Sequence, residues 1–237
     1  MKIQHRVLNG DQLENMIDLI LVKNKTEGNL KAHKILKDTV DVRTLLALSG
    51  GTAPNYKKMI VEPDDFIPGA IAVVDERYGE QFHKNSNELL LKKAGVKEFA
   101  DSHCIETHKI ITGNSFLDTE KIYEKTVGEL FEKFKKRVAV MGIGANLHTA
   151  GIFPHSAALK SPDYVVAQVV DDKFPKRISL TLKALGEFDS FVVLMFGKEK
   201  RKALEILLDE KEHDMQKYPA IFYRKTHAKV SLITDIA

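Results

Sequence analysis

The sequence has few of the features that mark secreted, membrane-bound or nucleic-acid-binding proteins. It contains one cysteine, Cys104, so no internal disulfide can form, and no zinc-ligand spacing surrounds that residue. The opening residues, MKIQHRVLNG, have no apolar core of the kind found in signal peptides. The apolar run 191–196 is far too short to cross a membrane. We therefore expect a cytoplasmic protein that does not associate with membranes.

Charge and composition indicate a single globular domain that acts on a small molecule. The formal net charge of +3 is low for 237 residues, and the lysines are scattered among nearly as many carboxylates. Without a basic tract, we expect no nucleic-acid partner and favour a small anionic substrate. No repeat, low-complexity tract or long linker divides the chain, and 43% apolar residues can build a large core. We expect a single domain over residues 1–237.

The apolar pattern alternates between strand-like and helix-like segments. Asp11 is a plausible cap for an N-terminal helix that carries Leu13, Met16, Ile17, Ile20 and Leu21 at helical spacing. The charged stretch through Lys37 continues as helix, with an expected interruption at Gly28 and Asn29. Strands are expected at 44–48, 71–74, 138–141, 164–170, 178–180, 191–196 and 230–233, with an edge strand within 101–111 and helices after 86, over 118–134 and over 198–208. This alternation predicts an α/β fold.

The loop after the central strand 138–141 is the first candidate for chemistry. Gly142 and Gly144 let backbone approach a ligand, and Asn146, His148 and Thr149 follow at the sheet edge where α/β proteins bind ligands. Taken alone, the same residues fit equally well a glycine turn in which the histidine bonds a neighbour.

A second glycine loop follows the strand 44–48. Gly50 and Gly51 allow consecutive N–H groups to point at one spot, and the hydroxyls of Ser49 and Thr52 add donors. A helix beginning after Pro54 would turn its positive end toward the same place, so the loop suits a phosphate. An ordinary strand-to-helix turn is the alternative.

Charged residues end one further strand, precede another and begin one helix. Asp75 and Arg77 could orient a sugar hydroxyl and hold an anion, although a solvated ion pair is the simpler interpretation. Arg177 could also close on an anion. Lys200 lies in a lysine-rich first turn that opposes the helix dipole, a conflict that a bound anion would remove and that solvent exposure would also explain. His103 and His108 lack the partners that a metal site needs, so they stay unassigned.

Together these loops resemble the motifs of 6-phosphogluconolactonases. The matching segments are, in order, LSGGTAP (48–54), DERYGEQFHKNSN (75–87), GIGANLHTAGIFP (142–154), KRISLTL (176–182) and GKEKRKAL (197–204). The resemblance implies a Rossmann-like, mostly parallel sheet flanked by helices, as in sugar-phosphate isomerases and deaminases. It implies hydrolysis of 6-phosphoglucono-δ-lactone in the pentose phosphate pathway, without metal or organic cofactor. We expect a monomer or homodimer.

The resemblance also assigns roles to individual residues. His148 becomes the general base on water, a task that suits an imidazole because it titrates near neutral pH. Asp75 would contact sugar hydroxyls, and Arg77 the phosphate or a structural partner. Backbone N–H groups of the glycine loops are candidates for holding the oxyanion, although the sequence does not say which. The phosphate would be held by Ser49, Gly50, Gly51, Thr52, Arg177 and Lys200.

Two departures from the family pattern leave alternatives open. The family has an aspartate and a glycine before the histidine, where this chain has Asn146 and Leu147. An amide orients without supplying charge, so His148 is expected to be a weaker base, and Leu147 must avoid positive φ or accept strain. We favour a working, slower lactonase. A sugar-phosphate-binding protein without activity is the second interpretation, and a glucosamine-6-phosphate deaminase is the third, disfavoured because that chemistry needs the missing acid.

Overall fold

A large parallel sheet organises the molecule. The computed structural model describes residues 2–3 and 17–236. Eight strands form the order β1-β2-β11-β10-β7-β3-β4-β6, and every pair is parallel except β1 with β2. The strands are β1 (Lys2–Ile3), β2 (Ile17–Leu21), β3 (Thr44–Leu48), β4 (Ala70–Val73), β6 (Glu106–His108), β7 (Lys136–Gly142), β10 (Ser190–Met195) and β11 (Lys229–Thr234). The predicted α/β fold with a mostly parallel sheet is confirmed.

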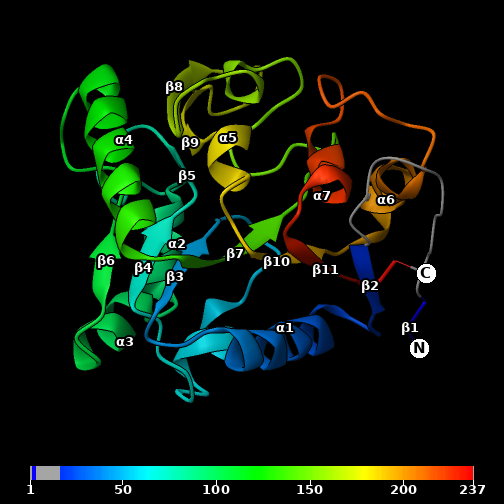
Figure 1. Ribbon diagram of the computed structural model, residues 1–237, viewed down its shortest axis with the longest axis horizontal. Helices are drawn as coiled ribbons and strands as arrows, with labels where there is room; N and C mark the ends of the chain where they lie inside the picture. The colour runs from blue at the N-terminus through cyan, green and yellow to red at the C-terminus, as the bar shows by residue number, and fades with distance from the viewer. Residues whose placement is uncertain (1, 4–16, 237) are drawn as a thin grey trace.

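Helices cover both faces of this sheet. Figure 1 shows α1 along its lower side in the view, with α4, α5 and α7 above it. The α-helices are α1 (Lys25–Thr39), α2 (Asn87–Lys93), α3 (Val96–Ser102), α4 (Phe116–Lys133), α5 (Leu182–Leu185), α6 (Arg201–Leu208) and α7 (Phe222–Lys225). Short helical turns are η1 (Lys57–Val61), η2 (Ala157–Leu159), η3 (Lys198–Lys200) and η4 (Pro219–Ile221). None of the helices in these described ranges is long and apolar enough to span a bilayer.

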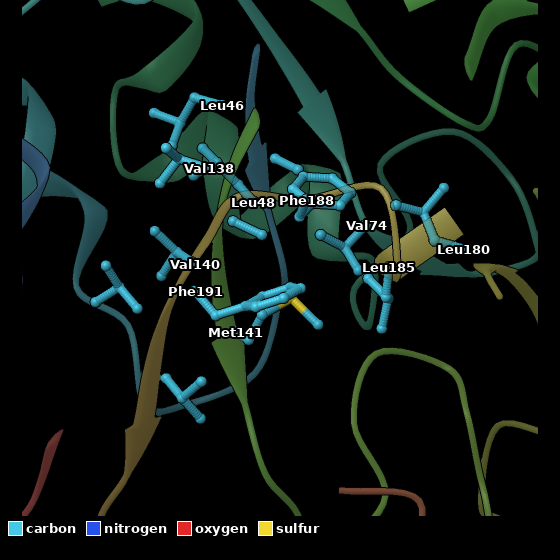
Figure 2. Close-up of a cluster of buried hydrophobic side chains, with 14 of the residues drawn as sticks. Leu46, Leu48, Val74, Val138, Val140, Met141, Leu180, Leu185, Phe188 and Phe191 are labelled. Carbon is cyan, nitrogen blue, oxygen red and sulfur yellow. The ribbon is translucent and has the colours of Figure 1, made fainter. Parts of the chain in front are cut away.

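The core lies against the central strands β3, β7 and β10. Strands covered on both faces need apolar residues throughout rather than in alternation, and every residue of β3 and β10 is buried. Figure 2 shows Leu46, Val138 and Phe191 from these strands in one cluster with Phe188. This packing fixes the strand ends, from which the functional loops leave.

The expected N-terminal helix is wrong where the structure describes it. Ile17, Ile20 and Leu21 belong to β2, which pairs in parallel with β11, and the proposed cap Asp11 lies outside the described residues. A short apolar run fits a helix or a buried strand equally well, and here backbone pairing with β11 makes it a strand. Tertiary pairing therefore overrides the local spacing.

The expected break at Gly28 and Asn29 is also wrong, because both residues lie inside α1. A Cβ on Gly28 would overlap the ring of Phe196, so the glycine permits close packing of α1 on the sheet. The Asn29 side chain donates to the carbonyl of Ala53 (3.3 Å) and accepts from the N–H of Asn55 (2.6 Å). Asn29 thereby ties α1 to the second glycine loop.

A small antiparallel sheet was not foreseen. Its strands are β5 (Asp75–Arg77), β9 (Lys176–Leu180) and β8 (Val165–Val169), in the order β5-β9-β8. The pairing places Arg77 directly opposite Arg177. The small sheet thereby brings together two charged segments, 75–77 and 176–177, that lie far apart in the sequence.

Candidate active site

A cleft of about 310 Å³ lies beyond the carboxyl ends of β3, β4 and β7. This is the edge at which open α/β sheets bind ligands. The loops after these three strands, the small sheet and η3 all contribute to its walls. Of the residues predicted for the site, those that line it are Ser49, Gly50, Gly51, Thr52, Asp75, Arg77, His148, Arg177 and Lys200.

The glycine loop after β3 has the geometry expected of a close backbone approach. A Cβ on Gly50 would overlap the side chain of Asn87, and Gly51 has a φ of +90°, a conformation that favours glycine. Ser49 is buried and its hydroxyl has no hydrogen-bond partner within the described residues. The helix expected after Pro54 is the five-residue η1. The loop therefore offers a ligand the unpaired hydroxyl of Ser49 and the backbone of Gly50 and Gly51, which have no side chains of their own.

The segment after β4 holds its charges in a buried network. Glu76 is fully buried and accepts from the N–H groups of Arg77, Asn87 and Glu88 and from the Ser86 hydroxyl, at 2.7 to 2.8 Å. The Asn87 side chain accepts from the Arg77 guanidinium and donates to the Asp75 carbonyl. Burial raises the pKa of Asp75 above its ordinary value, against the opposing effect of Arg77 and Arg177.

The loop after β7 is tied down on both sides of His148. Leu147 takes the strained conformation that the sequence allowed, with φ of 63°, and its side chain is buried. Its carbonyl accepts from the N–H of Ala220 (2.9 Å). Thr149 is buried, and its hydroxyl shares a hydrogen bond with Tyr223 (2.6 Å). Burial of Leu147 offsets the strain, and Thr149 has a structural role.

His148 is held in one orientation. Its Nδ1 lies 2.6 Å from Asn146 Oδ1, and its ring stacks on Phe153 at 4.4 Å with an angle of 8° between the planes. Because an amide oxygen only accepts, the contact assigns the proton to Nδ1 and leaves Nε2 as the free base. Asn146 itself is exposed and does not line the cleft. It acts on the site only through His148.

The surroundings of His148 keep its imidazole neutral. The pKa of His148 is lowered to about 4, chiefly by burial and next by the guanidinium of Arg177. Asp172 opposes the shift, while Lys200 and Arg77 add to it. At neutral pH the ring is therefore fully in the basic form but has little affinity for a proton.

Some of the positive charge that lines the cleft is already paired with groups of the protein. Arg177 is buried, donates to the Phe174 carbonyl (2.9 Å) and to Asp172, and lies 4.0 Å from Asp75. Lys200 is half-buried, has no carboxylate within 4 Å among the described residues, and has a pKa lowered by burial. Its neighbour Lys198 is exposed, so solvation explains that lysine. Lys200 is the cation with the freest access to an anion.

Sequence reasoning missed several residues of this site. Asn87 was given no role of its own in the site, whereas its side chain links Arg77 to Asp75. Phe153 and Asp172, which contact His148 and Arg177, carried no signal in the sequence. Lys25 donates to the carbonyl of Thr52 from the first turn of α1.

The unassigned histidines pair with single carboxylates away from this cleft. His103 lies 3.1 Å from Asp64 and His108 lies 3.6 Å from Glu106. Over residues 2–3 and 17–236, no group of three or more His, Cys, Asp or Glu side chains could hold a metal ion.

Comparisons with known proteins agree with this geometry. A model of the family described as glucosamine-6-phosphate isomerases/6-phosphogluconolactonase matches residues 29–232. The chain belongs to this family. A 6-phosphogluconolactonase from Xylella fastidiosa is 30% identical over 181 residues, which cover 72% of this chain and 74% of the relative. One from a Nostoc strain is 28% identical over 189 residues, covering 76% and 77%.

Solved structures show that the fold is that of the family. A 6-phosphogluconolactonase from Shewanella baltica has a TM-score of 0.75 at 20% identity and covers 95% of this chain and 99% of its own. A monomeric glucosamine-6-phosphate deaminase has a TM-score of 0.72 at 18% identity, covering 91% and 96%. The resemblance found in the sequence motifs is thus confirmed at the level of family and fold.

Proposed function

We propose that this protein hydrolyses 6-phosphoglucono-δ-lactone to 6-phosphogluconate, with His148 as the general base. The observation that carries the proposal is the neutral imidazole of His148, fixed through Nδ1 at the wall of a cleft rich in cations. Family membership and the names of the curated relatives support the same substrate. The oxidative pentose phosphate pathway is where such an activity would belong, in the cytoplasm.

In the proposed reaction His148 Nε2 takes a proton from water as its oxygen attacks the lactone carbonyl. Asn146 accepts from Nδ1–H throughout and so keeps the base on Nε2. The tetrahedral intermediate collapses with cleavage of the bond to the ring oxygen, which receives the proton back from His148. Positive charge from Arg77 and N–H groups of the glycine loops would stabilise the oxyanion.

The phosphate would lie at the other end of the cleft. Lys200 is its main cation, and the Ser49 hydroxyl with the backbone of Gly50, Gly51 and Thr52 supplies neutral donors. Arg177 would contribute through its charge and through Nη1, because its Nε and Nη2 already donate to Phe174 and Asp172. Asp75 would accept from sugar hydroxyls. Anchoring the phosphate positions the ring against His148.

Replacing Lys200 by alanine is expected to raise KM for the phosphorylated lactone about tenfold while kcat falls less than about threefold. The lost contact is present in both the bound substrate and the transition state, so it affects binding first. Steady-state kinetics measure this split, with Lys198→Ala as the control because that lysine is exposed in the same turn. Wild-type KM in Lys200→Ala would move the phosphate site elsewhere.

The pH dependence of kcat/KM should report the low basicity of His148. The base is active when deprotonated, so a pKa lowered to about 4 places the half-maximal rate near pH 4 and a plateau at neutral pH. Unphosphorylated glucono-δ-lactone, assayed in parallel, separates this limb from ionisation of the substrate phosphate. A half-maximal rate near pH 6.5, the ordinary imidazole value, would contradict the account.

The specific observation that favours a second function is Asn146. A neutral amide in place of the family's aspartate is compatible with a protein that binds sugar phosphates without hydrolysing lactones. We favour the enzyme because His148 remains free to act as a base and its orientation is preserved. The two functions differ in what a restored carboxylate would do.

Asn146→Asp is expected to raise the neutral-pH rate about tenfold and to move the acid limb upward. A carboxylate 2.6 Å from Nδ1 would stabilise the imidazolium and strengthen the base. Ala145→Asp is the matched control, since it adds a charge at the adjacent exposed position. If Asn146→Asp shows the wild-type rate and the wild-type acid limb of the pH profile, a charge at this position does not change the basicity of His148.

The decisive test of the substrate compares three compounds with the purified protein. We expect acceleration of 6-phosphoglucono-δ-lactone hydrolysis, a much smaller kcat/KM for glucono-δ-lactone, and no ammonia release from glucosamine 6-phosphate. Ammonia release would favour the deaminase, and binding of 6-phosphogluconate without hydrolysis would favour the binding protein.

A further inference from the structure

Neighbouring residues of α2 line two different clefts. Asn87 lines the candidate active site, whereas Glu88 lines a second cleft of about 400 Å³. The walls of this second cleft, which we call the α2 cleft, include the apolar side chains of Ile71, Val73, Leu91 and Val96, with Phe82 beside them. The polar residues Thr107 and His108 also line it. No residue lines both clefts, so the α2 cleft is separate from the proposed lactonase chemistry.

Glu88 brings an unsatisfied carboxylate oxygen to the α2 cleft. The residue is 4% exposed, and its Oε1 accepts from the N–H groups of Ile110 (2.6 Å) and Ile111 (2.9 Å). Its Oε2 has no hydrogen-bond partner within the described residues. Burial raises the pKa of Glu88 to about 7. A buried acceptor without a partner is costly, so a ligand that donates to Oε2 would remove a penalty already present in the protein.

Two lysines give the mouth of the α2 cleft a free positive charge. The ammonium groups of Lys92 and Lys109 lie 4.7 and 5.4 Å from the centre of the Phe82 ring. Within residues 17–236 neither lysine has a carboxylate within 4 Å, although Lys109 donates to the Gln81 side chain (3.2 Å).

The other charges at the mouth are of both signs. Lys97 pairs with Asp101 at 2.6 Å, so these two charges offset each other. Glu98 is exposed to solvent, which screens its charge. An anionic group of a ligand would therefore find the unpaired ammonium groups of Lys92 and Lys109 as its partners.

We propose that the α2 cleft binds a small aromatic acid that carries a hydroxyl group. The hydroxyl donates to Glu88 Oε2 at the buried end, and the ring packs against Leu91 and Val96. The carboxylate lies at the mouth beside Lys92 and Lys109. The hydroxyl, the ring and the carboxylate of the ligand thus meet, in that order along the cleft, an acceptor, an apolar wall and two cations of the protein.

Three related probes test each part of this arrangement. The full chain, labelled at its methyl groups, is titrated with 4-hydroxyphenylacetate, with phenylacetate and with 2-(4-hydroxyphenyl)ethanol. We expect 4-hydroxyphenylacetate to bind with a Kd on the order of 1 mM or tighter, and each of the other two to bind about tenfold more weakly. Methyl signals of Ile71, Leu91 and Val96 should shift, and that of Ile143 in the candidate active site should not.

Two sets of variants identify the contacts. Glu88→Gln keeps a carbonyl oxygen for Ile110 and Ile111 but replaces the charged acceptor by an amide N–H, which can only donate to the weakly accepting phenol oxygen, so the advantage of the hydroxyl should shrink severalfold. Glu98→Gln, at an exposed position of the same cleft, should bind as wild type. The double variant Lys92→Gln, Lys109→Gln changes two exposed residues, and it should abolish the advantage of the carboxylate.

Several results would overturn the proposal. Equal affinity of the wild type for 4-hydroxyphenylacetate and phenylacetate would mean that Glu88 receives no hydrogen bond. No methyl shift up to about 10 mM, or shifts at Ile143 in place of Ile71, would mean that the α2 cleft is not a site for this class of ligand. Unchanged selectivity in Glu88→Gln, or in the double lysine variant, would contradict the assigned contacts.

Discussion

Replacing His148 by alanine is expected to lower the catalysed rate of 6-phosphoglucono-δ-lactone hydrolysis by roughly 10²-fold to 10⁴-fold, the usual contribution of a general base. The variant removes Nε2, the atom proposed to take the proton from water. Affinity for 6-phosphogluconate should change less than about threefold, because the phosphate contacts come from Lys200 and the glycine loop. Initial rates and calorimetric titration measure the two quantities separately.

A second histidine of the same loop serves as the control. His155 is exposed and does not line the cleft, so His155→Ala should keep the wild-type rate. Wild-type activity in His148→Ala would remove His148 from the mechanism. Loss of 6-phosphogluconate binding in that variant would instead show that the imidazole holds the ligand.

Gly144→Ala is expected to have an effect of similar size although it leaves His148 in place. A Cβ on Gly144 would overlap the imidazole, so the ring would have to leave both Asn146 and Phe153. Misplacing a catalytic base by about 1 Å can cost on the order of 10²-fold in rate, and we expect a loss of at least that size. The rate relative to wild type is measured at saturating lactone.

The neighbouring Gly142 provides a matched comparison. A Cβ there would meet no atom within 4 Å, so Gly142→Ala should keep most of the activity. Thermal unfolding should show both variants folded, since the Gly144 clash is with a side chain that can rotate. Equal rates for the two variants would show that the position of His148 does not limit catalysis.

The order of elements and the place of the site could be predicted from the sequence because both depend on local patterns. Continuous apolar runs such as 44–48 and 138–141 identify buried parallel strands, and the glycines that end them mark the ligand edge. Since parallel strands share that edge, loops distant in the sequence had to meet there. Ser49, Asp75 and His148 accordingly line one cleft.

The sequence-based predictions were wrong where contacts between distant segments determine the secondary structure. The spacing of Ile17, Ile20 and Leu21 fits a helix, and only the pairing with β11 makes the segment a strand. Gly28 lies inside a helix because a ring from another element occupies the space of a side chain. Neither fact can be found without knowing which segments are neighbours.

The electrostatics of the site depended on burial for the same reason. The sequence predicted a weak base from Asn146 alone, whereas burial is the largest cause of the low pKa of His148. The partners of Arg177 could not be foreseen, because Asp172 and Asp75 meet it only through the small sheet. The residues that line the cleft were therefore predicted more readily than their interactions.

The rate of hydrolysis of freshly generated 6-phosphoglucono-δ-lactone at neutral pH tests the central claim most directly. Proton release is followed with wild-type protein, with His148→Ala and with buffer alone. We predict that the wild type accelerates hydrolysis clearly above the spontaneous rate and that His148→Ala approaches that rate. A wild-type progress curve identical to that of buffer, with 6-phosphogluconate still bound in a parallel titration, would contradict the assignment as an enzyme.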